Sequence, residues 1–257
     1  MTDLNLRNSF SELGLKSNDI VMIHGDAGVA AQYQDVSAKD KLDYLIDEIK
    51  EYFSPDGTIL VPAFSYSSTK HEDYHILKTP SAVGLFSESF RKSSDVNRSN
   101  HPIFSVSTWG KFGNEFLAGS YSDCFGPGTF FEILLEHNVR IITLGCDLNS
   151  VTFVHHVEQM KKVKYRYFKN FTGRIIDADQ IVNVDTKYYV RDTSTATNCN
   201  LALLSKLAKD RKLLQTGFLG RFPIQTIRAL DFFNVATELL DENEYSLIDA
   251  GMMKNEI

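Results

Sequence analysis

The chain has 257 residues and a formal net charge of −6, with 43% hydrophobic and 23% charged residues. This acidic balance argues against a nucleic-acid partner, since such proteins usually carry a basic stripe. No apolar run approaches the ~18 residues that span a bilayer, and the N-terminal residues show no signal-peptide pattern. Three widely spaced cysteines without a Cys-x-x-Cys pair argue against a zinc site. We therefore expect a cytoplasmic protein without membrane, nucleic-acid or metal partners.

Strand-like and helix-like patterns alternate in the first half of the chain. Residues 19–23 form a short apolar run that enters the loop 24–28, as a buried strand does. A helix is predicted from Ser37, because apolar residues follow at helical spacing over 42–53. After the turn at 55–57, a second buried strand is predicted over 58–61.

The same alternation continues to the middle of the chain. Helices are predicted over 85–91 and 129–136, and a third buried strand over 140–144. The next helix is expected to begin near Asn149 or Ser150. Short strands that alternate with helices indicate a layered α/β fold.

Beyond residue 164 the pattern changes. Residues 165–168 and 187–190 mix aromatic and polar side chains, which predicts partly solvated antiparallel strands. Helices are predicted over 201–208 and 226–240. Without a repeat or a clear linker, the simplest organisation is one domain over residues 1–257. Its predicted fold is a single α/β/α domain with a central mixed β-sheet.

The segment over 145–158 is the most informative, because it joins a strand end, a short loop and a helix start. Ligands of α/β sheets favour the crevice at the carboxyl ends of the strands. Thr152, His155 and Glu158 are spaced by three and would lie near one helical line. A second line, suited to the core, contains apolar residues: Phe153, Val157 and Met160.

This arrangement suits acyl transfer to an amine. A neutral imidazole at His155 could take the proton that the amine must lose, and a helix start disfavours the imidazolium form. The Thr152 hydroxyl or the free N–H groups of the first helical turn could stabilise an oxyanion. Glu158, or a carboxylate from another segment, could orient the ring. The alternatives are that His156 is the base, or that the pattern is merely a polar helix face with a core histidine.

Two further segments could contact a ligand. The stretch 97–105 combines a cation, hydroxyls and a histidine, which suits phosphate or carbonyl contacts, although a polar turn fixed by Pro102 would look the same. Backbone N–H groups of the loop 24–28 could cradle a ligand, as could those of many strand-to-helix turns. We interpret Cys124 and Cys146 as structural, since neither has a nearby histidine in sequence.

Taken together and in order, the blocks 21–24, 56–65, 98–105, 125–128 and 148–158 resemble the aminoglycoside 3-N-acetyltransferase family, also called the antibiotic N-acetyltransferase fold. A weaker block covers 217–233, so that the resemblance spans nearly the whole chain. It implies direct transfer from acetyl-CoA without an acyl-enzyme. His155 matches the family's catalytic histidine and Thr152 its neighbouring threonine, whereas His156 falls where the family varies.

The resemblance also implies a binding site for coenzyme A formed by three segments. The expected contact residues are His24, Gly25, Asp26, Phe64, Ser65, Arg98, Ser99, His101 and Ser105. Gly25 and Asp26 depart from the small hydroxyl residues usual in the family. A carboxylate beside phosphates is unfavourable, so we expect Asp26 to point away.

Other departures bear on the acceptor. Phe222, Pro223 and Ile224 replace the small and polar residues of drug-modifying members. The segment 165–173 looks more like members associated with surface-polysaccharide synthesis. There, Arg166 and Lys169 would suit a diphosphate, or would simply be solvated strand residues.

The sequence therefore predicts an acetyl-CoA-dependent N-acetyltransferase that acts on an amino sugar, nucleotide-linked and destined for O-antigen or capsule synthesis. One alternative is an aminoglycoside 3-N-acetyltransferase that confers antibiotic resistance. Another, from a different class, is a non-catalytic ligand-binding protein on the same fold. The oligomeric state is open, with a homodimer among the alternatives.

Overall fold

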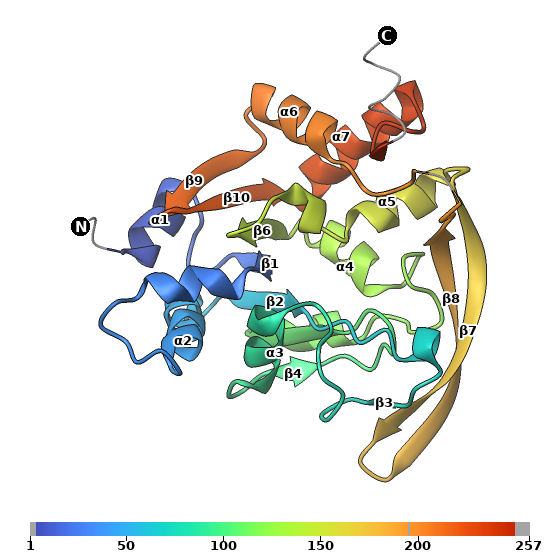
Figure 1. Cartoon of the computed structure of the whole chain (residues 1–257), viewed down its shortest axis with the longest axis horizontal. Coiled ribbons are helices and arrows are strands. Elements are labelled where there is room, and N and C mark those ends of the chain that lie inside the picture. Colours follow the sequence, from blue (N-terminus) through green and yellow to red (C-terminus); the bar gives the residue numbers. More distant parts are fainter. Residues whose placement is uncertain (1–3, 195, 250–257) are drawn as a thin grey trace.

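The computed structural model describes residues 4–194 and 196–249. Its central sheet has seven strands in the order β4-β5-β2-β1-β6-β10-β9 (Figure 1). The three middle strands run parallel: β1 (Ile20–Gly25), β2 (Thr58–Pro62) and β6 (Arg140–Leu144). The outer strands are antiparallel to their neighbours: β4 (Asn97–Arg98), β5 (Val106–Gly110), β9 (Gln215–Leu219) and β10 (Phe222–Arg228). The predicted mixed sheet is confirmed.

Side chains of β1 enter two different cores because successive residues of a strand face opposite sides of the sheet. Val21 and Ile23 lie in one core and Met22 lies in the other. The first core is covered by α1 (Leu6–Glu12), α2 (Lys41–Phe53) and α3 (Leu85–Lys92). The second is covered by α4 (Phe130–Glu136), α5 (Val154–Lys161), α6 (Ala202–Asp210) and α7 (Ala229–Glu242). The layered α/β/α architecture follows, and the central strands read as continuous apolar runs because both faces are buried.

A second sheet, in the order β3-β7-β8, flanks this body (Figure 1). Its long antiparallel hairpin consists of β7 (Arg166–Asp177) and β8 (Gln180–Arg191), and β3 (Tyr74–His75) pairs with β7. Phe171 and Tyr188 pack against the second core, while most of the other hairpin side chains are exposed. This confirms the predicted, partly solvated antiparallel strands, which extend beyond the predicted residues 165–168 and 187–190.

Short 3-10 helices complete the fold: η1 (Ala27–Gln32), η2 (Ser68–Lys70), η3 (Gly113–Leu117) and η4 (Leu148–Ser150). None of the described helices combines the length and apolar character that crossing a membrane requires.

Three predicted helix starts are wrong. The helix expected from Ser37 begins at Lys41, because Asp40 N–H donates to the Ser37 carbonyl and closes a turn first. The helix expected from Thr226 begins at Ala229, since Thr226 and its neighbours pair with β6 in the sheet.

The third correction concerns the segment after β6. The helix expected near Asn149 or Ser150 is a single 3-10 turn, η4, closed by the Asp147 side chain, which accepts from Asn149 N–H at 3.0 Å. The chain is then extended at Val151, and α5 begins at Val154. Met160, expected in the core, is 42% exposed.

Candidate active site

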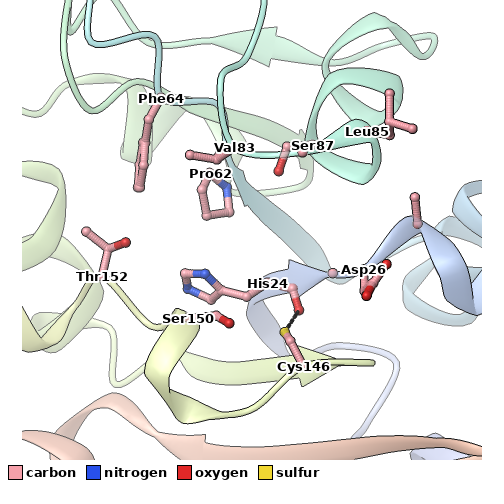
Figure 2. A pocket seen from close by; sticks show the side chains of 13 residues that line it. His24, Asp26, Pro62, Phe64, Val83, Leu85, Ser87, Cys146, Ser150 and Thr152 are labelled. Carbon is pink, nitrogen blue, oxygen red and sulfur yellow. Dashed lines mark hydrogen bonds between the residues drawn. The ribbon is translucent and has the colours of Figure 1, made fainter. Parts of the chain in front are cut away.

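A pocket of about 430 Å³ lies at the carboxyl ends of β1, β2 and β6 (Figure 2). Ligands of α/β folds bind at this end of the parallel strands. Four of the residues expected to contact coenzyme A line it: His24, Gly25, Asp26 and Phe64. Thr152 lines it as well, so the pocket reaches the segment that leads into α5.

His24 lies at the end of β1 with its ring near Thr152, Ser150 and Pro62 (Figure 2). It is 7% exposed, and burial lowers its pKa to about 4, so the imidazole is neutral at neutral pH. Its Nε2 atom has no hydrogen-bond partner among the described residues. A buried polar atom without a partner costs free energy, so this nitrogen is suited to a ligand's hydrogen-bonding group.

Gly25 is required by packing. A Cβ atom at this position would lie 2.6 Å from a ring carbon of Phe86 in α3, well inside van der Waals contact. Gly25 replaces the small hydroxyl residue usual at this position because α3 approaches β1 too closely for a side chain. Asp26 lines the pocket, but its Oδ1 accepts from Gly28 N–H at 2.7 Å and caps η1. One carboxylate oxygen is thus directed to the backbone.

Arg98 is buried, and backbone carbonyls and one hydroxyl engage its guanidinium. Nε donates to Ser105 Oγ at 3.1 Å, Nη1 to the carbonyls of Ile76 and Thr79, and Nη2 to the Ala63 carbonyl. These bonds attach the loop that follows β3 to the end of β2. Arg98 therefore anchors the loop leading to Val83, which lines the pocket.

The other polar residues expected at the cofactor are buried in the same region and bonded within the protein. Ser65 Oγ donates to the Pro102 carbonyl at 3.0 Å, and Ser99 Oγ accepts from Val106 N–H at 2.9 Å. His101 Nδ1 accepts from two backbone N–H groups, which leaves Nε2 to donate to a carbonyl. These side chains and that of Ser105 do not line the pocket. Their contact with a cofactor stays a prediction.

His155 lies in the first turn of α5, beyond Thr152. Its Nδ1 is 2.6 Å from Oε2 of Glu158, one helical turn later. Oε1 of the same carboxylate accepts from the Tyr165 hydroxyl at 2.8 Å, and Arg166 Nε lies 2.8 Å from Oε2. The Glu158 side chain is fully buried, whereas that of His155 is 21% exposed. The structure thus joins His155 and Glu158 in one buried cluster with an open edge, while Thr152 faces the pocket.

The charges in this cluster assign the protonation states. Burial, followed by the charge of Arg166, lowers the pKa of His155 against the opposing effect of Glu158. Burial alone would raise the pKa of Glu158, but the charge and hydrogen bond of His155 and the charge of Arg166 make it lower than usual. At neutral pH the carboxylate is ionised and the imidazole neutral. Nδ1–H then donates to Glu158, and the Nε2 lone pair is available.

The neighbouring His156 has a different environment. Its Nδ1 is 2.6 Å from the Phe125 carbonyl, its ring stacks on Phe153, and it is 1% exposed. It ties α5 to the turn before α4. Sequence spacing could not separate the two histidines, but their surroundings do.

The N–H groups of the first turn of α5 are not free, contrary to expectation. Those of Val154, His155 and His156 donate to carbonyls three residues earlier, at 3.0–3.3 Å. This tight first turn follows from the interrupted helix start at Val151. The sequence suggested two kinds of oxyanion donor here, and the Thr152 hydroxyl is the one that remains a candidate.

Arg166 and Tyr165 are cluster members that the sequence did not identify. The interpretation of Arg166 as a solvated residue or a diphosphate ligand is wrong, because its side chain is 4% exposed and its guanidinium contacts Glu158. The chain reverses at Lys162, which adopts a left-handed conformation (φ 54°), and this returns β7 alongside α5. A local sequence pattern does not reveal such a reversal.

The cysteines show no activated thiol. Burial raises the pKa of Cys124 and Cys146, and the latter lines the pocket with Sγ 3.3 Å from the His24 carbonyl. Within residues 4–194 and 196–249, no group of three or more His, Cys, Asp or Glu could hold a metal ion.

A mixed α/β sheet with a pocket at its parallel strand ends, and a buried histidine–carboxylate pair beyond Thr152, suits an enzyme that moves a proton at a bound substrate. The sequence profile of the aminoglycoside 3-N-acetyltransferase family matches residues 30–241, and the chain belongs to this family. Membership confirms the predicted enzyme class, an N-acetyltransferase.

Individual relatives are distant. The chain is 22% identical over 220 residues to aminoglycoside N(3)-acetyltransferase IX of Micromonospora chalcea, covering 76% of each chain. It is 26% identical over 199 residues to the SPbeta prophage-derived aminoglycoside N(3')-acetyltransferase-like protein YokD of Bacillus subtilis strain 168, covering 68% of this chain and 70% of the relative. The crystal structure of the AAC(3)-IVa apoenzyme superposes with a TM-score of 0.78 at 20% identity, covering 94% of this chain and 89% of that one. These structural likenesses confirm the fold.

Proposed function

We propose that this protein acetylates the amine of an amino sugar by direct transfer from acetyl-CoA, with His155 as the general base. The observation that carries the proposal is the 2.6 Å contact between His155 Nδ1 and the buried Glu158 carboxylate. This contact fixes the ring and its tautomer, so that Nε2 presents a lone pair at the open edge. A base held in this way can take the proton that an ammonium group must lose before attack.

The pocket suits the pantetheine arm of the cosubstrate. Phe64, Val83 and Leu85 offer apolar walls, and the unpartnered Nε2 of His24 can bond an amide of the arm. The N-terminus of α3, capped by Gly84 without a side chain, opens at the pocket and favours an anion. When bound, the cosubstrate supplies the acyl group as a thioester.

Thr152 connects the two halves of the site. It lines the pocket, and its carbonyl accepts from His155 N–H at 3.0 Å. Its hydroxyl can therefore donate to the oxygen that gains negative charge as the amine adds to the thioester. The acyl group would be transferred where the pocket meets the His155 edge, with no covalent enzyme intermediate.

The charges near His155 support our choice of acceptor class. Arg166 and Arg191 both act on the ring electrostatically, opposed by Glu158. The adjacent end of the hairpin carries Lys187 as well, paired with the buried Asp123 at 2.9 Å. Lys187 and Arg191 are the exposed cations at this end of the hairpin, and they disfavour a polycationic acceptor and favour a sugar linked to a nucleotide diphosphate. We accordingly infer a cytoplasmic nucleotide-linked amino sugar used in O-antigen or capsule synthesis.

The alternative acceptor is an aminoglycoside, because the relatives are named as aminoglycoside N(3)-acetyltransferases. Thiol release from acetyl-CoA, measured with nucleotide-linked amino sugars, free amino sugars and aminoglycosides, separates the classes. The highest kcat/KM is expected for a nucleotide-linked sugar. A preference for an aminoglycoside, with a raised inhibitory concentration on overexpression, would replace the acceptor and keep the chemistry.

His155→Ala is expected to lower kcat by about 10²- to 10⁴-fold, the usual contribution of a general base. His137→Ala is the matched control, since His137 is a partly exposed histidine at the C-cap of α4, paired with Glu115 at 3.3 Å. Thiol release should stay near the wild-type rate in the control. Normal turnover by His155→Ala would exclude His155 as the base.

A further inference from the structure

Arg166 places a permanent positive charge inside the His155 cluster. Its Nη2 lies 2.8 Å from Nδ1 of His155, and its Nε lies 2.8 Å from Oε2 of Glu158. Nη1 donates to the Tyr189 carbonyl at 3.1 Å, which fixes the guanidinium from the hairpin side. The Nε–Oε2 approach is not aligned as a hydrogen bond, so this contact is an electrostatic one within the described chain.

Nδ1 of His155 therefore has two neighbours with incompatible demands. Arg166 can only donate, whereas an ionised Glu158 can only accept. If Nδ1 carried no proton, its lone pair would face the carboxylate at 2.6 Å, which is repulsive. Nδ1 therefore carries the proton and donates it to Glu158. Arg166 then lies against a ring that becomes cationic whenever Nε2 takes a second proton.

We propose that Arg166 is a positioning residue that keeps Glu158 ionised and limits the lifetime of the His155 imidazolium. The attraction of Glu158 alone would trap the proton on the ring after each transfer. The guanidinium offsets this attraction, so the base returns to its neutral form at physiological pH. This inference rests on the proposed function, in which His155 is the base.

Few charged groups set the protonation state of His155, because the other titratable groups around the cluster are neutral. The Tyr165 hydroxyl bonds Glu158 from the start of β7, and burial raises its pKa. Cys199, ahead of α6, also feels Glu158, and burial raises its pKa to about 12. Both are neutral at pH 7. The charges that face the ring are thus Glu158 from α5, Arg166 from β7 and Arg191 from β8.

Arg166→Met removes the nearest positive charge and keeps a side chain of similar bulk. With Glu158 less opposed, the imidazolium gains stability, so the acidic limb of kcat/KM should move to higher pH by about one unit or more. For a one-unit move, thiol release should fall by up to about threefold at pH 7 and recover towards pH 9. Arg166→Lys keeps the positive charge, so the acidic limb of its pH profile should stay near that of the wild type. Its kcat can still fall, because lysine lacks the planar guanidinium.

Glu158→Gln provides the opposite test. It keeps an acceptor for Nδ1–H but removes the negative charge, so the limb should move to lower pH. Arg211→Met is the matched control, because Arg211 forms an exposed two-bond pair with Glu238 between α6 and α7, at 2.6 and 2.7 Å. Its pH profile should match that of the wild type. If Arg166→Met does not fold, Glu158→Gln and Arg166→Lys carry the comparison.

Titration of the His155 ring by NMR tests the role of Arg166 separately from the role of His155 as the base. The His155→Gln variant is used to assign the ring signals. A ring pKa that rises in Arg166→Met and falls in Glu158→Gln supports the inference. If the ring pKa shifts but the kinetic limb does not follow, His155 is not the base and the proposed function fails. If Arg166→Met lowers kcat equally at every pH and leaves the ring pKa unchanged, Arg166 is merely structural and the inference is overturned.

Discussion

His155 and His156 are adjacent on α5, and their contacts give them different chemistry. One ring is held by a buried carboxylate and keeps an open edge, and the other is stacked on Phe153 and bonded to a backbone carbonyl. Thr152 is separated from both because α5 begins two residues after it. Its hydroxyl thereby faces the pocket rather than the helix line on which the sequence placed it.

Thr152→Val tests the hydroxyl at nearly constant volume. If it donates to the oxyanion, kcat should fall by about 10²- to 10³-fold, as on loss of one such donor elsewhere. The KM for acetyl-CoA should change little, since the interaction forms only in the transition state. Thr152→Ser keeps the hydroxyl and should recover most of the rate in the thiol-release assay. A rate within twofold of the wild type in Thr152→Val would assign the oxyanion to another donor.

At the scale of elements, the sequence predicts the interior well and the boundaries poorly. The buried strand at 140–144 matches β6 because apolar residues covered on both faces leave little choice of element. The start of α7 was misplaced because Thr226 and Ile227 suit either a helix or a strand, and only pairing with β6 decides. The predicted cofactor-binding residues that do line the pocket lie at strand ends. Arg98 does not line it, because its guanidinium donates to backbone carbonyls of distant segments. Such tertiary bonds leave no local pattern.

The loop between β3 and α3 depends on Arg98. Arg98→Met removes its bonds to the carbonyls of Ile76, Thr79 and Ala63, so the loop that delivers Val83 and Gly84 to the pocket should loosen. We expect the KM for acetyl-CoA to rise about tenfold or more, with kcat reduced far less, because the His155 cluster is untouched. Initial rates at saturating acceptor measure this split. An equal loss in kcat with unchanged KM would mean that the loop does not shape the cofactor pocket.

At the scale of the whole molecule, several imidazoles are kept neutral by burial, among them His24 at the end of β1 and His101 behind the loop before β5. Burial lowers the pKa of these two to about 4, below the 6.5 of an exposed histidine. The unfolded chain therefore binds more protons than the native one between these values. The stabilisation is fully present above pH 6.5 and is lost as the pH falls towards 4. The free energy of unfolding should decrease by about 1.4 kcal/mol per pH unit for each histidine in this window.

Urea denaturation at pH 7, 5.5 and 4.5 measures this loss. Glu88 stays ionised in the native protein, since its hydrogen bonds to Arg91 lower its pKa to about 2. The unfolded chain protonates it only near its ordinary pKa of 4.5, so its contribution enters at the lowest of these pH values and is shared by the wild type and the His24→Asn variant. His24→Asn removes one titrating ring from the pocket while keeping a polar side chain, and its stability should fall less steeply with pH than that of the wild type. Because His24 also lines the pocket, acetyl-CoA that binds the native state through it should raise the stability without flattening the slope, since it opposes protonation of the native ring alone. A stability that is independent of pH between 6.5 and 4.5 would show that these histidines are not held neutral by the fold.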